Sequence, residues 1–330
     1  MRPAAHRGPL EVGAEEQQAA IADQAGSLLP PGRRLPRWLL ALKVALVIGG
    51  LIVLLRWAVQ RLPGDAAALD LRVLFGAVVL NQLALFAAAW RLQTTLAAFG
   101  VYIRRHQAMR IHLQSLFYFF FVPMSVGLEI ARFIKVRDID PAVSKKRLLF
   151  ALLFDRVLGL AAVLIVLGVL LPLVLPALLP RLWHPGWLLI AVAATSILGA
   201  TSWIHRPLRD RLSDLVAAIA QVGRLLPPLI GLSLATLLLV CASVYLIAAG
   251  AGIDIGLVQL TFALSGSLLG MSLPVSVLGA TLGEAAGAGI FAVLGLNAGS
   301  AILLVSAAYG GRLLGALQGG VIELLSSGWS

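Results

Sequence analysis

The feature that most constrains the fold of this chain is a series of long, nearly uncharged apolar runs. Six of them suit an α-helix that crosses a bilayer core, which takes about 20 residues; they cover residues 38–59, 71–90, 148–174, 187–204, 225–249 and 298–325. Backbone polar groups must be paired within hydrocarbon, so only helices and closed barrels span a membrane. The runs are continuous rather than alternating, which excludes a barrel. The sequence therefore predicts an all-α, polytopic transmembrane helix bundle.

The composition leaves little material for a water-soluble domain. Charged residues make up 12% of the chain and hydrophobic residues 60%, whereas a soluble domain has about 25% charged residues. We therefore expect no soluble domain large enough to be an enzyme, and the chain is predicted not to be one. The predicted organisation is a disordered cytoplasmic tail over 1–36, a transmembrane domain over 37–325 and a short C-terminal tail over 326–330.

The net charge of +11 has two explanations. In a soluble protein it would suggest nucleic acid, whereas in a membrane protein the cytoplasmic loops collect Lys and Arg. The segment 91–110 carries four arginines and no acid. This pattern predicts a multi-pass protein of the cell (inner) membrane, with that segment and the N-terminus in the cytoplasm. Such loops attract anionic lipid headgroups at about 1 kcal/mol per cation, so we expect that contact and no nucleic acid.

One apolar segment, Leu113–Val126, is short for a span and has basic loops on both sides. It ends in Pro123 and Ser125, followed by Gly127. A helix that crossed the membrane here would leave one of the basic loops outside. We therefore predict a re-entrant hairpin that enters from the cytoplasm and returns there. A short, tilted span is the alternative.

A second segment has the same design. Residues 257–273 are apolar and are interrupted at Pro274, followed by Gly279, Gly283 and Glu284. Paired broken segments in the two halves of a chain indicate a transporter binding site, because broken helices present backbone groups and helix dipoles at membrane depth. The prediction is six spans plus two proline-broken re-entrant segments related as an inverted repeat. The glycines taken alone, at small-xxx-small spacing, are better explained by close helix packing.

Ionisable residues inside the apolar runs are the candidates for a site. Asp155 and Arg156 lie within one run, at a cost of about 2.5–3.5 kcal/mol each on insertion scales. Adjacent side chains point about 100° apart on a helix, so these two cannot share one partner. We expect Asp155 to contact Arg132, Arg156 to reach a lipid phosphate or a carbonyl, and Arg312 to pair with Glu284. Internal ion pairs that only fix the bundle are the alternative.

Two other patterns carry less weight. Asp138-Ile139-Asp140 resembles the DxD of glycosyltransferases, but Asp140-Pro141 is typical of a helix N-cap followed by an N1 proline, which is the favoured interpretation. The five histidines show no metal-ligand spacing. We therefore predict no metal and no cofactor.

Three motifs together resemble the lysylphosphatidylglycerol synthase transmembrane region family, a flippase-like domain. They are Pro123…Gly127-x-Glu129-x-x-Arg132, Asp155-Arg156-x-x-Gly159 and Pro274…Gly279…Gly283-Glu284, and the resemblance covers about residues 37–325. The family often has a second glycine and an aspartate where this chain has Leu128 and Glu129. That difference keeps the charge and removes one flexible position.

The resemblance implies that the chain moves a lipid with a charged or glycosylated headgroup, a membrane phospholipid or glycolipid, between leaflets. The substrate-binding residues would be Glu129, Arg132, Asp155, Arg156, Glu284 and Arg312. The broken segments would be shaped by Pro123, Gly127, Pro274, Gly279 and Gly283. The synthases add a cytosolic aminoacyl-transferase domain; we expect none after Leu325, and therefore no lysyl transfer.

Two other functions stay open at this stage. One is an accessory protein of glycolipid, hopanoid or polysaccharide biosynthesis. The other is a membrane-embedded glycosyltransferase, for which Asp138 and Asp140 are the only candidate acids. The prediction also allows for a homodimer.

Overall fold

The computed structural model describes residues 70–121, 127–182, 222–271, 276–277 and 280–326, together with Ala45. The chain divides into two compact units, residues 1–46 and residues 47–330. In the first unit Ala45 is helical and is the one residue described. All further observations concern the second unit.

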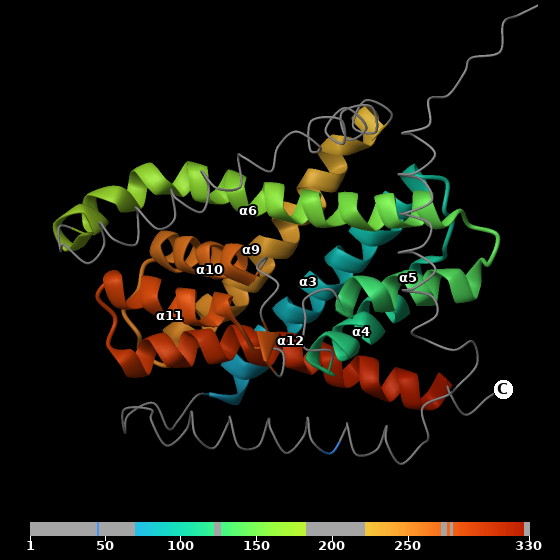
Figure 1. The fold of residues 1–330 in the computed structure, drawn as a ribbon. Helices are drawn as coiled ribbons and strands as arrows, with labels where there is room; N and C mark the ends of the chain where they lie inside the picture. Colours follow the sequence, from blue (N-terminus) through green and yellow to red (C-terminus); the bar gives the residue numbers. More distant parts are fainter. Residues whose placement is uncertain are drawn as a thin grey trace, which may run out of the picture. The chain divides into compact units, whose positions relative to one another are not determined.

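The described part of the second unit is built from helices (Figure 1). They are α3 (Leu71–Ala98), α4 (Arg105–Phe121), α5 (Gly127–Ile139), α6 (Lys145–Leu182), the 3₁₀ turn Gly223–Leu225, α9 (Leu226–Gly250), α10 (Leu257–Met271), α11 (Leu282–Val293) and α12 (Ala298–Ser326). Between α10 and α11 lies one short antiparallel pair, β1 (Ser276–Val277) with β2 (Ala280–Thr281). Because these strands have only two residues each and the other described elements are helical, the all-α class is confirmed for the described residues.

Four of these helices are long and apolar enough to cross a membrane: Leu71–Ala98, Lys145–Pro176, Gly223–Gly250 and Ala298–Glu323. They agree with four of the predicted crossings and make the chain a multi-pass membrane protein. The two other predicted crossings, 38–59 and 187–204, lie outside the described residues. The count of six spans therefore stays a prediction.

The end of α3 corrects the predicted 91–110 loop. The helix continues past Arg91 to Ala98, because Leu92, Thr95 and Leu96 extend its buried face. The C-cap Phe99 follows Ala98, and the next residue, Gly100, has a φ of 74°, which suits the left-handed position after a helix. The loop is therefore reduced to the connection between α3 and α4. Arg91 interrupts the apolar run in the sequence without interrupting the helix.

Helix α6 begins and ends differently from the prediction. It does not begin at Asp140, whose Oδ1 accepts a hydrogen bond from the Ala142 N–H at 3.2 Å within a turn; the helix begins at Lys145. The predicted N-cap is therefore wrong, because aspartate can close an Asx turn as well as cap a helix. At the other end α6 continues through Pro172 and on to Leu182, beyond the predicted end at 174. Prolines are tolerated in membrane helices, where neighbouring groups satisfy the freed carbonyls.

The described helices repeat one order, long, short, short, long. The first set is α3, α4, α5 and α6, with 28, 17, 13 and 38 residues. The second set is α9, α10, α11 and α12, with 25, 15, 12 and 29 residues. In each set the two short helices pack against one another as a hairpin. At 1.5 Å per residue the short helices measure only about 18–25 Å.

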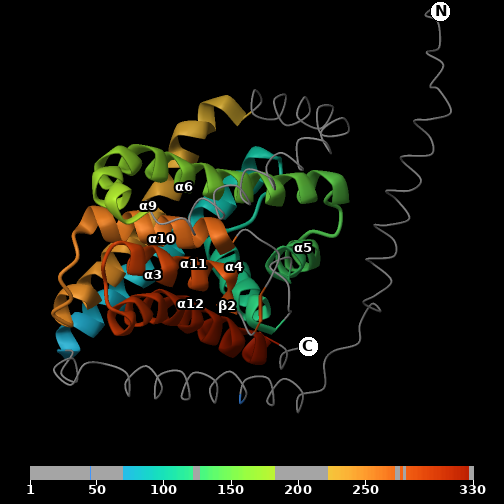
Figure 2. The same ribbon diagram turned by 60° about the vertical axis from the view of Figure 1, so that its left-hand side comes forward.

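The two sets are inverted relative to one another. Helices α3 and α9 pack side by side and run antiparallel, since Ala77 contacts Ser243 and Arg91 contacts Ser233. The α4–α5 hairpin starts and ends where α3 ends and α6 begins. The α10–α11 hairpin starts and ends where α9 ends and α12 begins, which is the opposite end. Each hairpin also packs on a long helix of the other set, α4 on α12 and α10 on α6 (Figure 2).

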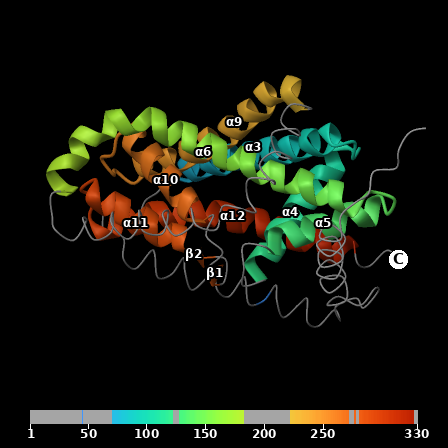
Figure 3. The same cartoon turned by 45° about the horizontal axis from the view of Figure 1, so that its top comes forward.

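Glycines allow the closest of these contacts. Helices α10 and α11 lie side by side (Figure 3), and a Cβ on Gly270 would lie 3.0 Å from the Gly283 backbone. A Cβ on Gly287 would lie 2.9 Å from Ser267 Oγ. The packing interpretation of the late glycines is confirmed for Gly283 and Gly287, while Gly279 lies outside the described residues. On α12, Gly319 packs directly against the backbone of α4.

Candidate functional site

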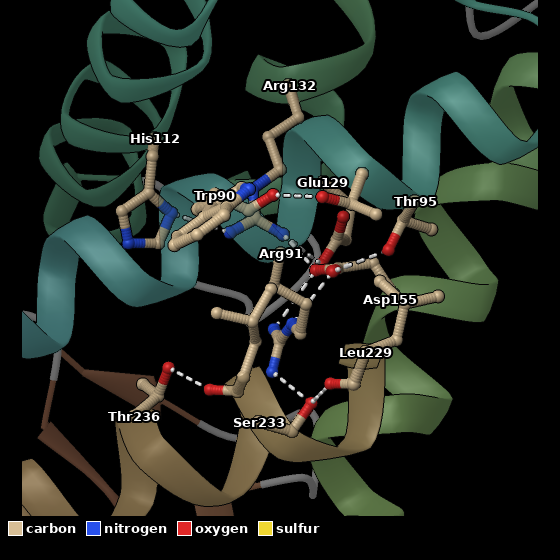
Figure 4. Close-up of polar contacts among 12 residues, drawn as sticks. Trp90, Arg91, Thr95, His112, Glu129, Arg132, Asp155, Leu229, Ser233 and Thr236 are labelled. Carbon is tan, nitrogen blue, oxygen red and sulfur yellow. Dashed lines mark hydrogen bonds and ion pairs between the residues drawn. The ribbon is translucent and has the colours of Figure 1, made fainter. Parts of the chain in front are cut away.

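The centre of the candidate site is the carboxylate of Asp155, which is 1% exposed in the interior of the first helix set. Arg91 of α3 binds it with two hydrogen bonds, from Nε to Oδ1 at 2.9 Å and from Nη2 to Oδ2 at 3.1 Å. Thr95 Oγ1 lies 3.5 Å from Oδ1. Figure 4 shows the arginine pointing from α3 towards the carboxylate on α6. This bidentate geometry gives both direction and strength to the ion pair.

The third donor group of Arg91 is also engaged. Its Nη1 donates to Ser233 Oγ of α9 at 3.2 Å, and Ser233 Oγ in turn donates to the Leu229 carbonyl at 2.9 Å (Figure 4). On α6, a Cβ on Gly159 would lie 3.4 Å from Arg91 Nη1. Residues four apart share one helix face. The Asp-Arg-x-x-Gly spacing therefore supplies a carboxylate and, one turn later, room for the guanidinium that binds it.

Arg132 of α5 provides the second cation. Its Nη1 lies 3.3 Å from Asp155 Oδ2, which confirms the contact expected from the sequence. The same Nη1 is 3.6 Å from Glu129 Oε1, and Nη2 is 2.9 Å from His112 Nδ1 on α4. Arg132 is 5% exposed. One guanidinium therefore joins three of the four helices of the first set.

His112 is neutral in this arrangement. Burial, and after it the neighbouring Arg132 guanidinium, lower the pKa of His112 from 6.5 to about 3. A neutral imidazole can accept from Arg132 through Nδ1, whereas an imidazolium would place a second positive charge beside the guanidinium. The hydrogen bond from Arg132 to His112 Nδ1 therefore forms only when the imidazole is neutral.

Glu129 is the accessible part of the cluster. Its side chain is 21% exposed, compared with 1% for Asp155. Burial raises the pKa of Glu129, although the Arg132 charge opposes the shift. Glu129 Oε2 and Arg132 Nε have no hydrogen-bond partner among the described residues. Both atoms are buried. A buried polar group left unpaired costs about 1–3 kcal/mol, so a polar group that reached these atoms would be stabilised.

The three remaining candidate residues, Arg156, Arg312 and Glu284, differ in what the structure shows of their surroundings. Arg156 is half-buried, and its charge lowers the pKa of Glu129 against the effect of burial. The Arg312 guanidinium lies 5.8 Å from the Tyr309 ring on α12. Glu284 is the third residue of α11, as Glu129 is the third residue of α5. The Glu284 side chain is outside the described part, so its pairing with Arg312 stays a prediction.

Most of the residues that were expected to break the two apolar segments lie outside the residues that the structure describes. Gly127 is the first residue of α5, and Gly283 packs against α10. Pro123, Pro274 and Gly279 lie outside the described residues. Helix α4 ends at Phe121 and α5 begins at Gly127, so the predicted break at Pro123 stays a prediction.

A second polar cluster joins α4, α5 and α12. The carboxylate of Glu323 accepts from Gln114 Nε2 at 2.6 Å and from the Tyr118 hydroxyl at 3.1 Å. Lys135 Nζ lies 2.8 Å from Glu323 Oε1. Arg132 and Lys135 are three residues apart on α5. This helix is therefore fixed to α6 through one cation and to α12 through the other.

Sequence reasoning missed Arg91, His112, Ser233 and Glu323. Arg91 ends an apolar run and was assigned to a basic loop. Its signal was the continued helical spacing of Leu92, Thr95 and Leu96, which puts Arg91 inside a helix. No local signal identifies Ser233 or Glu323, because their partners are more than a hundred residues away. Within the described ranges no group of three or more His, Cys, Asp or Glu could hold a metal ion.

The fold and the cluster together define a class: a multi-pass α-helical membrane protein with a charged centre buried among its helices. The chain belongs to the family described as the lysylphosphatidylglycerol synthase TM region, whose model matches residues 38–310. This membership relates the chain to lipid handling in a membrane. No match was found among curated proteins or among solved structures.

Proposed function

We propose that this chain moves a lipid with a charged or glycosylated headgroup between the leaflets of a membrane, and that it acts as a transporter rather than an enzyme. The observation that carries the proposal is the buried cluster of Arg91, Arg132, Asp155 and Glu129. Charged groups inside a membrane domain are costly and usually mark a pathway or a binding site. Unpaired polar atoms at Glu129 and Arg132 support binding in addition to a structural role.

The two arginines are suited to different roles. Arg91 has all three donor groups engaged at 2.9–3.2 Å, so it serves as the fixed counter-ion of Asp155. Arg132 makes longer contacts with both carboxylates, at 3.3 and 3.6 Å, and its Nε is unpaired among the described residues. A phosphate could take over Arg132 while Asp155 remains bound to Arg91. We infer that Arg132 is the cation that exchanges with the headgroup.

The helix hairpins support a path for the headgroup. We propose that α4–α5 and α10–α11 are re-entrant, entering from opposite sides of the membrane. Their helices measure about 18–25 Å, shorter than the roughly 30 Å of a bilayer core, and each hairpin starts and ends at one end of the bundle. Glu129 and Glu284 occupy the same place in the two hairpins. A headgroup could thus meet an equivalent acid from either side.

Group transfer by the Asp138–Asp140 pair is less well supported. Asp140 Oδ1 is engaged by the Ala142 N–H within a turn, and Asp138 is exposed. Neither belongs to the buried cluster. We therefore retain translocation as the single proposal.

The test is lipid movement in vesicles reconstituted with the full chain. Labelled phosphatidylglycerol, a labelled glycolipid and labelled phosphatidylcholine would be followed as they become accessible from outside. Arg132→Gln, Arg156→Ala and Glu284→Gln should each abolish movement of the preferred lipid. Arg72→Gln, an exposed change at the start of α3, is the matched control and should move lipid normally. Unchanged movement in folded Arg156→Ala and Glu284→Gln proteins would contradict the proposal.

A further inference from the structure

One end of the bundle collects exposed basic side chains. It is the end where α3 finishes and where α4, α6 and α9 begin. The exposed cations there are Arg104, Arg105, Lys145, Lys146, Arg147 and Arg224, and the neighbouring acids are Asp138 and Asp140. At the opposite end the charged residues of the described helix ends and connections are Asp70, Arg72, Arg181 and Asp254. Positive charge is therefore concentrated on one end. We call this end the basic surface.

Tertiary contacts assemble this surface from segments that are distant in sequence. A Cβ on Gly100 would lie 3.4 Å from Arg147 Nη1, so the α3–α4 connection lies against the start of α6. Phe99 packs in the same cluster as Val222, which precedes α9. Figure 1 shows the teal end of α3 and the green start of α6 together. The cations therefore belong to one surface rather than to separate loops.

Aromatic side chains mark where this surface meets the apolar side of the bundle. Trp90 is 40% exposed, and the Arg105 guanidinium lies 5.0 Å from its ring centroid. Tyr102 is 80% exposed. On the N-terminal side of Trp90, α3 exposes apolar side chains, among them Phe86 and Phe75. Trp and Tyr favour the boundary between hydrocarbon and water, so Trp90 marks the level at which lipid tails give way to headgroups.

We propose that the basic surface binds the phosphate groups of anionic phospholipids in the leaflet that it faces, with Arg104, Arg105 and Arg147 as the principal donors. A guanidinium matches a phosphate with paired N–H groups. An acidic protein or a nucleic acid would supply the charge but would have no reason to adjoin an exposed apolar helix face. The continuity from Phe86 through Trp90 to Arg105 therefore favours a lipid. This proposal does not depend on lipid translocation.

The test compares lipid binding by the purified full chain in neutral detergent, using native mass spectrometry with short-chain phosphatidylglycerol and phosphatidylcholine. The wild type should bind phosphatidylglycerol in preference. The triple variant Arg104→Gln, Arg105→Gln, Arg147→Gln should lose roughly fivefold in affinity per cation, or about a hundredfold in total. Arg72→Gln, at the far end of α3, removes one exposed cation and should leave the preference unchanged.

Further variants keep the result interpretable. The three single variants should each lose roughly fivefold, and Trp90→Leu should weaken binding while the bundle remains folded by circular dichroism. Equal binding of both lipids by the wild type would overturn the proposal. A preference for phosphatidylglycerol that survives in the triple variant would also overturn it, as would a loss of affinity in Arg72→Gln equal to that of the single variants. Tighter binding of an acidic peptide or RNA than of phosphatidylglycerol would overturn it as well.

Discussion

Arg91 and Asp155 are 64 positions apart, yet their side chains form a bidentate ion pair with contacts of 2.9 and 3.1 Å. Asp155 is 1% exposed and the Arg91 side chain 12%. Because both charges lie inside the bundle, each makes the burial of the other tolerable. The pair joins α3 to α6, and Ser233 extends the connection to α9. The position of three long helices therefore depends on one guanidinium.

Removing this guanidinium should destabilise the protein strongly. Arg91→Gln leaves the Asp155 carboxylate buried without its main counter-ion, and breaking a buried pair in this way costs about 3–5 kcal/mol. Thermal unfolding in detergent would measure the effect. The control Arg72→Gln changes an exposed arginine on the same helix and should stay within about 0.5 kcal/mol of wild type. Equal midpoints for the two variants would show that the pair has no structural role.

Glycines on α12 offer a second comparison within one helix. A Cβ on Gly319 would overlap the Leu113 carbonyl of α4, whereas a Cβ on Gly310 would meet nothing within 4 Å. Gly319→Val should therefore separate α4 from α12 and lower the unfolding midpoint by the equivalent of about 1–3 kcal/mol or more, the usual cost of overpacking. Gly310→Val should have a small effect. Similar midpoints in both variants would contradict the close packing of α4 on α12.

Stability should fall in mild acid because of His112. The pKa of His112 is about 3 in the folded protein and 6.5 ordinarily. Between these two values the unfolded chain binds a proton at His112 and the folded chain does not. Stability is therefore complete above pH 6.5 and declines as the pH falls towards 3. Between pH 7 and pH 5 the loss from this residue is about 2 kcal/mol. Burial is the main cause of this lowered pKa; the Arg132 and Arg91 charges lower it further, and the Asp155 carboxylate opposes them.

His112→Asn provides the control for that prediction. Asparagine can still accept a hydrogen bond from Arg132 but does not titrate. The difference in unfolding midpoint between pH 7 and pH 5 should therefore be smaller in the variant than in the wild type. Parallel pH profiles for the two proteins would show that His112 is not buried as a neutral group.

The proposed orientation can be tested with a single thiol. Cys241 is the one cysteine of the chain and is buried, so it should react slowly with a membrane-impermeant maleimide. Arg104→Cys places a thiol on the basic surface, and the positive-inside rule puts that surface in the cytoplasm. The added thiol should react in inverted vesicles and not in intact cells. Asp254→Cys, at the other end of the bundle, should show the reverse pattern.

Much of the fold follows from the sequence. The apolar runs predicted the helices later seen as α6, α9 and α12, and the run 257–273 contains α10, which begins at Leu257 and ends at Met271. These predictions succeed because hydrocarbon accepts only paired backbone, so length and hydropathy fix the secondary structure. They fail at helix ends. Arg91 marks the end of an apolar run but lies mid-helix, and Pro172 marks an end that α6 passes through.

The candidate site was predicted in part. The motif residues Arg132 and Asp155 were expected to meet, and they do. His112 and Ser233 were not expected, because a lone histidine and a serine in apolar surroundings carry no distinctive local pattern. Glu323 was missed for the same reason, although it binds three side chains from two other helices.

The sequence by itself determined the class of the protein, its helical construction and its family, because all three depend on the order of residue types along the chain. The tertiary structure alone decided which charges share a site. The cost of burying a charge depends on the partner within a few ångströms, and that partner is chosen by helix packing. Arg91 looks like a loop residue beside Trp90 in the sequence. Across the bundle from Asp155 it becomes the fixed counter-ion of the site.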